Sequence, residues 1–223
     1  MRFLKRLVNH DQQNSFVNQL RKKRFAFLQD RIEALIAEKG SCKILDIGGD
    51  IGYWKHIGWE DQRCHIYLLN LYENNLAEKD AENFHAVVGN ALDIPFEAGE
   101  FDLVFSNSVI EHVGSEANQQ LFAEEVKRIC DRYIIQTPSF WFPLEPHSLL
   151  PLFQFIPHRL RALLIMRFNI NYFPRAETYA EALAVSRSTI MFTKKRFSKL
   201  FPGAEIRVEK LYGIPKSYTV IKL

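Results

Sequence analysis

The chain has 223 residues, of which 47% are hydrophobic and 25% are charged, with a formal net charge of +3. This is ordinary globular composition, and the length suits one α/β domain with some additions. No run of about 18 apolar residues is present, so we expect no transmembrane helix. The basic segment 1–10 is followed by no apolar signal core, so we expect no secretion signal.

The three cysteines, Cys42, Cys64 and Cys130, are an odd number at wide spacing. They form neither a metal-binding pattern nor a disulfide framework, which favours a reducing compartment, and we predict a cytoplasmic protein. The seven histidines show no metal-ligand spacing either. We therefore expect no metal site.

The chain begins with a predicted helix over residues 12–39, because apolar residues recur there at helical spacing. Gly40 is a suitable C-cap. We interpret residues 1–39 as an N-terminal helical extension and residues 40–223 as the main domain. A short β-run over 43–47 opens that domain, and residues 53–60 are expected to be a short helix or irregular.

Predicted strands then alternate with helices or loops that are long enough to connect two parallel strands. Residues 115–129 are a predicted amphipathic helix with Ser115 as its N-cap. This alternation predicts a Rossmann-like α/β fold with a mostly parallel sheet, in which ligands bind beyond the carboxyl ends of the strands. The further strands are predicted at 64–70, 84–90, 101–107, 132–138, 204–213 and 217–223, with a helix at 193–201. Polar residues at four strand ends are expected to face one crevice: Asp46, Asn70, Asn90 and Asn107.

Residues 138–175 break the alternation with a segment rich in proline and aromatic residues. It is too long and too apolar for a plain loop, so we interpret it as a substrate-side insertion or lid after the fifth strand. Two interpretations stay open. The segment completes the domain as a secondary hydrophobic cluster, or it forms an apolar acceptor pocket open to a membrane surface, since Arg159, Arg161 and Arg167 border apolar residues.

The stretch "KILDIGGDIGYW", residues 43–54, is a strand that runs into a glycine-rich turn. Its G-G-x-x-G spacing fits poorly to the G-x-G-x-x-G of dinucleotide-binding folds. S-adenosylmethionine has no pyrophosphate, and Asp46 is placed to hold the ammonium group of its amino-acid tail. Glycines let the backbone approach such a ligand without a Cβ clash. A tight turn without a ligand is the alternative for the turn alone.

Together with downstream stretches, this motif resembles the class I S-adenosylmethionine-dependent methyltransferases, small-molecule branch. The matching pieces are "ILDIGGDIGYW", "LLNLYENN", "VVGNALDIPFEAGEFDLVFSNSVIEHV" and "TPSFWFPLEPHSLLPLFQFIP", in family order. The resemblance covers about residues 40–223. The aromatic, proline-rich segment around "FPLEPH" is similar to that of a bacterial subgroup of the family. It implies a seven-stranded, mostly parallel sheet flanked by helices with an antiparallel last strand, S-adenosylmethionine as cofactor, and S-adenosylhomocysteine as product.

The resemblance also implies roles for individual residues. Asp46 and the glycines match the first motif, and Asn70 and Leu71 match positions at the ribose hydroxyls and the adenine. Asn90 matches the position that bonds the adenine amino group. The full implied cofactor set is Asp46, Gly48, Gly49, Gly52, Asn70, Leu71, Asn90, Ala91, Ser106 and Asn107.

Asn70 and Asn90 depart from the family, which usually has Asp or Glu at these positions. Asn keeps a carbonyl acceptor, but it loses the charge assistance that roughly doubles the strength of such a bond. We therefore expect weaker cofactor binding or compensation by the backbone.

Methyl transfer to a hydroxyl benefits from a general base, and His is the usual choice. His147, on the insertion, is a catalytic or lid-stabilising candidate, and Glu145 is expected to orient it or to bind the substrate. His112, after the fourth strand, is either structural or catalytic. Glu111 is expected to be a capping or solvated carboxylate. Trp141 and Phe142 are further substrate-side candidates.

The predicted function is methylation of a small or medium organic acceptor, more at oxygen than elsewhere, with hydrophobic, lipid-linked or glycan-linked acceptors included. The alternative is a non-catalytic methyltransferase-like domain that serves as a binding module. A nucleic-acid substrate is disfavoured, because "SNSVIEHV" stands where base-modifying enzymes carry a polar-Pro-Pro-aromatic stretch. The expected partners are a small-molecule acceptor and a peripheral membrane surface, and the sequence does not indicate the oligomeric state.

Overall fold

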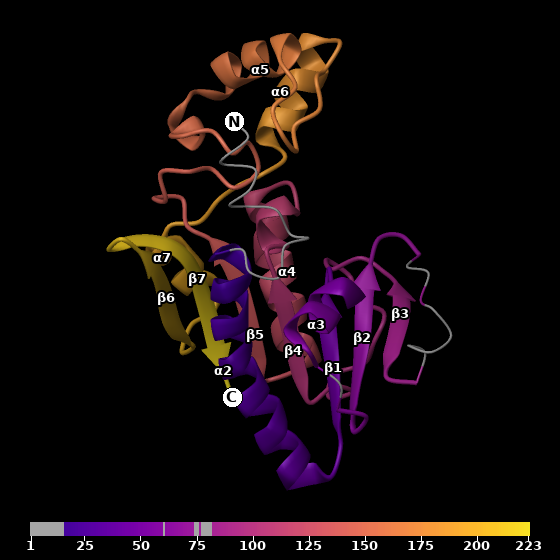
Figure 1. Ribbon diagram of the computed structural model, residues 1–223. Helices are drawn as coiled ribbons and strands as arrows, with labels where there is room; N and C mark the ends of the chain where they lie inside the picture. Colours follow the sequence, from indigo (N-terminus) through magenta and orange to yellow (C-terminus); the bar gives the residue numbers. More distant parts are fainter. Residues whose placement is uncertain (1–15, 60, 74–75, 77–81) are drawn as a thin grey trace. The chain divides into compact units, whose positions relative to one another are not determined.

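Buried strands alternate with helices along much of the chain, as the sequence predicts (Figure 1). The computed structural model describes residues 16–59, 61–73, 76 and 82–223, with side chains from Phe25 onward. The helices are α2 (Phe16–Lys39), α3 (Ile51–Ile57), α4 (Glu116–Ile129), α5 (His158–Arg167), α6 (Tyr179–Arg187) and α7 (Lys194–Leu200), with 3-10 turns η2 (Ile110–His112) and η3 (Phe153–Phe155). The strands are β1 (Cys42–Ile47), β2 (Cys64–Asn70), β3 (Phe84–Val88), β4 (Leu103–Asn107), β5 (Tyr133–Pro138), β6 (Glu205–Leu211) and β7 (Ile214–Lys222).

The seven strands have the order β3-β2-β1-β4-β5-β7-β6. β1 pairs in parallel with β2 and β4, and β2 pairs in parallel with β3, whereas β6 and β7 are antiparallel. The predicted Rossmann-like fold with an antiparallel end is confirmed. The chain divides into two compact units, one holding residues up to Ser106 with Lys127–Ile134, the other Asn107–Val126 with Ile135–Leu223.

The predicted elements are found within a few residues of their expected bounds. Ser115 is the N-cap of α4, since its hydroxyl accepts a hydrogen bond from the backbone N–H of Asn118 at 3.0 Å. The first four residues of the helix predicted at 12–39 lie outside the described residues. α6 was not predicted, although its capping box is visible in the sequence as Thr178 and Glu181.

α2 contributes one aromatic side chain to the core of the first unit. Phe25 is 3% exposed, and its ring packs edge-on against Trp54 and Trp59 with centroid distances of 6.2 and 5.9 Å. Phe27, two residues further along α2, is only half-buried. Phe25 therefore packs the middle of α2 against the two tryptophans.

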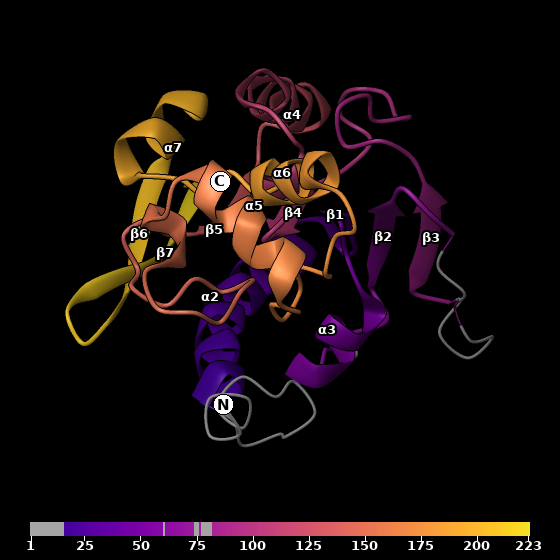
Figure 2. The same cartoon turned by 90° about the horizontal axis from the view of Figure 1, so that it is seen from above.

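The second unit contains the predicted insertion, which has a core of its own. α5 and α6 lie side by side (Figure 2). Buried residues of both helices and of the neighbouring segments form one hydrophobic cluster. The cluster extends past the predicted bounds 138–175, since Ala176 and Ala182 belong to it, and the role of the insertion as a lid stays a prediction. The buried members of the cluster are Phe153, Ala162, Ile165, Ile170, Phe173, Ala176 and Ala182. Among the described residues, none of the helices combines the length and the apolar character that crossing a bilayer requires.

We predict that Phe25→Ala lowers the free energy of unfolding by about 3–5 kcal/mol, because it removes a buried ring and leaves a cavity. The measurement is equilibrium urea unfolding, read as the shift in midpoint. Phe27→Ala on the same helix is the matched control and should cost clearly less. Equal losses for the two variants would contradict the packing described for Phe25.

Candidate functional site

Asp46 lies near the end of β1 and its carboxylate is buried. Its Oδ2 accepts a hydrogen bond of 2.7 Å from the indole N–H of Trp54. Burial raises the pKa of Asp46 to about 8, against the smaller lowering effect of that hydrogen bond. A carboxyl group with this pKa is largely protonated at pH 7, and a cation beside it would favour its ionised form.

The turn after β1 requires glycine for two separate reasons. Gly48 has a φ of 70°, which L side chains rarely adopt. A Cβ on Gly49 would collide with Oδ2 of Asp46, so the buried carboxylate occupies the space that a side chain would need. Gly52 is less constrained, because its Cβ would meet only the exposed Asp50 carboxylate. The turn therefore disfavours a side chain at Gly48 and at Gly49.

Asn70, at the end of β2, is joined to this turn. Its side-chain N–H donates a hydrogen bond of 2.8 Å to the carbonyl of Gly49. A carboxylate could not donate this bond, which gives a physical reason for Asn where the family usually has an acid. Leu71 follows with 63% of its surface exposed, so an apolar side chain is accessible beside the turn.

Asn90 follows β3, and its side chain serves a local turn. Its Oδ1 accepts a 2.9 Å hydrogen bond from the backbone N–H of Leu92, across Ala91. One lone pair of this carbonyl therefore holds the loop, and the second remains as an acceptor. The carboxyl ends of β1, β2 and β3 are adjacent in a parallel sheet, since Asp46 aligns with Leu68 and Asn70 with Val88.

The two residues expected beside the methionine portion differ in exposure. Ser106 is buried and donates a 3.0 Å hydrogen bond to the carbonyl of Ile47, so it ties β4 to β1. Asn107 belongs to the second unit and is half-buried. Ser108 then adopts a φ of 61°, a strained conformation for a residue with a side chain, where the chain leaves β4.

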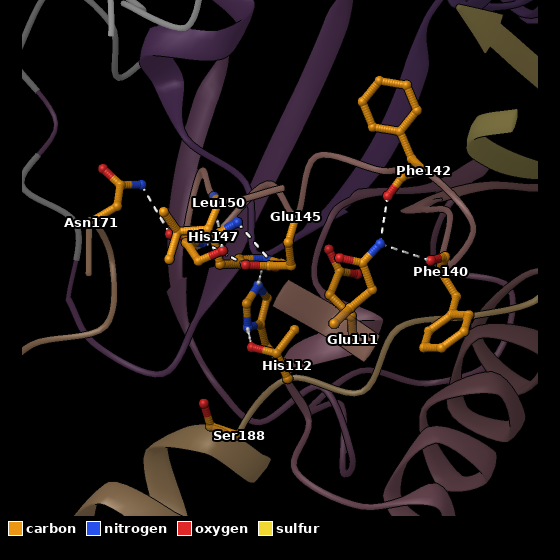
Figure 3. Close-up of polar contacts among 12 residues, drawn as sticks. Glu111, His112, Phe140, Phe142, Glu145, His147, Leu150, Asn171 and Ser188 are labelled. Carbon is orange, nitrogen blue, oxygen red and sulfur yellow. Dashed lines mark hydrogen bonds and ion pairs between the residues drawn. The ribbon is translucent and has the colours of Figure 1, made fainter. Parts of the chain in front are cut away.

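The second unit gathers both candidate histidines (Figure 3). Nδ1 of His147 lies 2.5 Å from Oε1 of Glu145, and Nε2 of His147 lies 3.1 Å from Nε2 of His112. Glu145 is 3% exposed and also accepts hydrogen bonds from the backbone N–H groups of His147 and Ser148. The expectation that Glu145 orients His147 agrees with this geometry.

Among the hydrogen-bonded side chains Glu145, His147 and His112, the pKa shifts favour a neutral His112 and an ionised Glu145. Burial lowers the pKa of His112 to about 4, and the neighbouring His147 adds to this lowering. Burial alone would raise the pKa of Glu145, but His147 and Ser148 together outweigh it and leave that pKa below its ordinary value. His112 is consequently a weak base, and His147 is the histidine whose ring a carboxylate orients.

Glu111 is not the capping or solvated carboxylate that the sequence suggested. Its side chain is 0% exposed, and its Oε2 accepts a 3.0 Å hydrogen bond from the Thr137 hydroxyl. Its Oε1 has no hydrogen-bond partner among the described residues. Burial raises the pKa of Glu111 to about 7. The turn η2 buries this side chain, and no local pattern in the sequence indicates that.

A cavity of about 500 Å³ lies in the second unit near these groups. Glu145 and Thr189 line it, and the Thr189 hydroxyl lies 3.5 Å from Nδ1 of His112. Phe140 belongs to its wall, whereas neither Trp141 nor Phe142 lines it, and Trp141 is 54% exposed. Its walls also carry positive charge from Arg161, Arg187 and Arg196.

Asn70→Asp should lower the free energy of unfolding by about 1–2 kcal/mol, because the variant loses a donor and sets a carboxylate against the Gly49 carbonyl. Urea unfolding of the ligand-free protein measures the change. Asn70→Ala, which loses the donor without adding charge, is the control and should cost less. An Asp variant as stable as the parent would show that this hydrogen bond contributes nothing.

Comparison with known proteins supports the sequence-based resemblance. Residues 45–132 match the family model described as a methyltransferase domain. Monomeric WbdD is similar in fold, with a TM-score of 0.52 and 15% identity, covering 89% of this chain and 40% of that one. PigF with SAH has a TM-score of 0.49 and 14% identity, covering 98% of this chain and 73% of that one.

A candidate O-methyltransferase from Nostoc punctiforme PCC 73102 has a TM-score of 0.47 and 14% identity, covering 86% of this chain and 54% of that one. The chain thus spans about half or less of the lengths of the Nostoc protein and WbdD. At 15% identity the similarity to WbdD shows the fold alone. No curated protein matches the sequence.

Proposed function

We propose that this chain, whose residues 45–132 match the family model of a methyltransferase domain, transfers the methyl group of S-adenosylmethionine to a small or medium organic acceptor. The observation that carries the proposal is the glycine turn after β1, with Asp46 buried beneath it and Asn70 bonded to it. Such a turn offers a carboxyl group and a glycine backbone without side chains to a nucleoside that has no phosphates.

The first unit supplies the groups that suit the cofactor. A sulfonium nucleoside with an amino-acid tail needs an anion for its ammonium, backbone polar groups near the ribose, and an apolar contact for the adenine. Asp46 offers the anion and exposed Leu71 the apolar contact, and the glycine turn admits the ligand without a Cβ clash. Asn70 keeps its Oδ1 as an acceptor for a ribose hydroxyl while its N–H holds the turn.

The second unit supplies the groups that suit the acceptor. Its cavity of about 500 Å³ is within the size range of small-molecule sites. In the proposed reaction an acceptor oxygen attacks the methyl carbon in line, the carbon–sulfur bond breaks, and S-adenosylhomocysteine leaves with the bonding electron pair. Glu145 lines this cavity and His147 does not. The attacking hydroxyl would lie at Nε2 of His147, which Glu145 orients and which accepts the proton. The reaction would then be an O-methylation.

We predict that S-adenosylhomocysteine binds and that its binding releases close to one proton at pH 7. Asp46 is protonated in the free protein, and the ammonium of the ligand draws it into the ionised form. Calorimetric titration at pH 7 in two buffers of different ionisation enthalpy measures the released proton. The affinity for the ligand should rise up to about tenfold from pH 6 to pH 7, because the lower proton concentration competes less with the ligand's ammonium for Asp46.

Asp46→Asn is the matched control, since its amide oxygen can still accept the Trp54 bond. This variant should bind the ligand more weakly and release no proton. Absence of any heat or thermal shift with the parent protein would favour the non-catalytic binding module instead. Binding without proton release would overturn the role of Asp46 alone.

We also propose that α5 contacts an anionic membrane surface, which would favour hydrophobic or lipid-linked acceptors. One face of α5 is buried, yet Leu160 and Leu163 on another are 52% and 54% exposed. Phe168, just after the helix, is 56% exposed, and Arg159 and Arg167 are exposed beside these apolar groups. Such a mixture of apolar and cationic side chains is typical of helices that lie in a lipid interface.

The protein should therefore float with vesicles that contain phosphatidylserine, and binding should fall in high salt as the arginine contribution is screened. Leu160→Glu combined with Leu163→Glu should abolish flotation without unfolding the protein, because both side chains are exposed. A protein that stays wholly in the soluble fraction at low salt would rule out this contact. Leu121→Glu, at an exposed leucine on α4, is the control.

A further inference from the structure

His112, His147 and Glu111 bring three potential metal-ligand atoms close together. One ligand atom from each of Glu111, His112 and His147 lies within 4.8 Å of the others. Among the described residues this is the group of His and carboxylate side chains that could hold a metal ion. Figure 3 shows the residues meeting from η2 and from the insertion.

The two imidazole nitrogens have the spacing of metal ligands. Nε2 of His112 and Nε2 of His147 are 3.1 Å apart. Two nitrogens bound to one tetrahedral Zn²⁺ at about 2.0–2.1 Å lie roughly 3.3–3.4 Å from each other. The two rings meet at 87° with their Nε2 atoms facing, so a small separation would admit an ion between them.

The buried carboxylate of Glu111 has one oxygen without a hydrogen-bond partner among the described residues. Its side chain is fully buried, and its Oε1 lacks a hydrogen-bond partner among the described residues while Oε2 is held by Thr137. A buried carboxylate oxygen without a partner costs free energy, so such an atom calls for an explanation. A cation on Oε1 would supply one, since it would balance the buried charge.

The surroundings of His147 match those of a metal-bound histidine. Its Nδ1–H donates to Glu145, which leaves the lone pair on Nε2 directed at His112. Metal-ligating histidines usually donate their other ring N–H to a carboxylate or a carbonyl, which fixes the tautomer. Glu145 is fixed in turn by the backbone N–H groups of His147 and Ser148.

We propose that Glu111, His112 and His147 bind a divalent first-row transition-metal ion, with Glu145 as the positioning residue for His147. Two imidazoles and one carboxylate suit Zn²⁺, Fe²⁺ or Co²⁺ and leave a coordination position open. The sequence missed the site because its ligands are an adjacent pair and a third residue far along the chain. An ion bound there would occupy Nε2 of His147, so in the loaded protein that atom would hold the ion and would not be free to accept a proton.

The site can be tested without methyl transfer. The full chain is treated with a chelator, desalted and titrated with ZnCl₂ by calorimetry, and bound zinc is counted by elemental analysis after gel filtration. We expect one equivalent of Zn²⁺ and a rise in melting temperature, because the ion binds the folded state. His56→Ala, which removes an exposed histidine on α3, is the matched control and should leave the stoichiometry unchanged.

Glu145→Gln should weaken zinc binding by about 10–100-fold without losing the site, as expected for a group that orients a ligand and does not touch the ion. Glu111→Gln and His147→Gln should each weaken it more. His147→Gln keeps the test valid if Glu111→Gln does not fold. No stoichiometric zinc, or equal binding by parent, Glu111→Gln and His147→Gln, would overturn the proposal. Titration with S-adenosylhomocysteine is read separately, so failure of the metal site and failure of the proposed function are distinguishable.

Discussion

The close approach of the Asp46 carboxylate to the backbone of Gly49 is the constraint on which the first unit depends. The carboxylate fills the place that a side chain at Gly49 would need, so the two residues constrain each other. Trp54 holds the carboxylate from α3, and Asn70 holds the turn from β2. The acid and the glycine therefore act together. The first unit thus places a buried acid directly against a turn whose glycines carry no side chains.

A second constraint operates in the other unit, where buried carboxylates surround two histidines. Glu145 is ionised because His147 and nearby N–H groups stabilise its charge more than burial opposes it. Glu111 has one hydroxyl partner, and burial dominates its electrostatics. The same residue type thus has opposite pKa shifts within one cluster. This contrast makes Glu145 a fixed orienting group and Glu111 a group that needs either a proton or a cation.

Much of the fold was predictable because its signals are local. The β-runs, the Ser115 cap and the glycine turn each depend on neighbours in the sequence, and each is found as expected. The missed helix α6 also had a local signal in its capping box. No local signal shows which of Phe25 and Phe27 is buried. Which of them meets the tryptophans depends on the rotation of α2, and that is set by packing.

The sequence by itself determined the order of strands and helices, the glycine turn with Asp46, and the resemblance to methyltransferases. Periodicity and turn chemistry act over a few residues, so they can be read along the chain. Tertiary structure alone decided that Asn70 serves as a donor, that Glu111 is buried, and that His112 and His147 face each other. These facts depend on distances between residues that are far apart in sequence, and only the folded chain brings them within hydrogen-bonding reach.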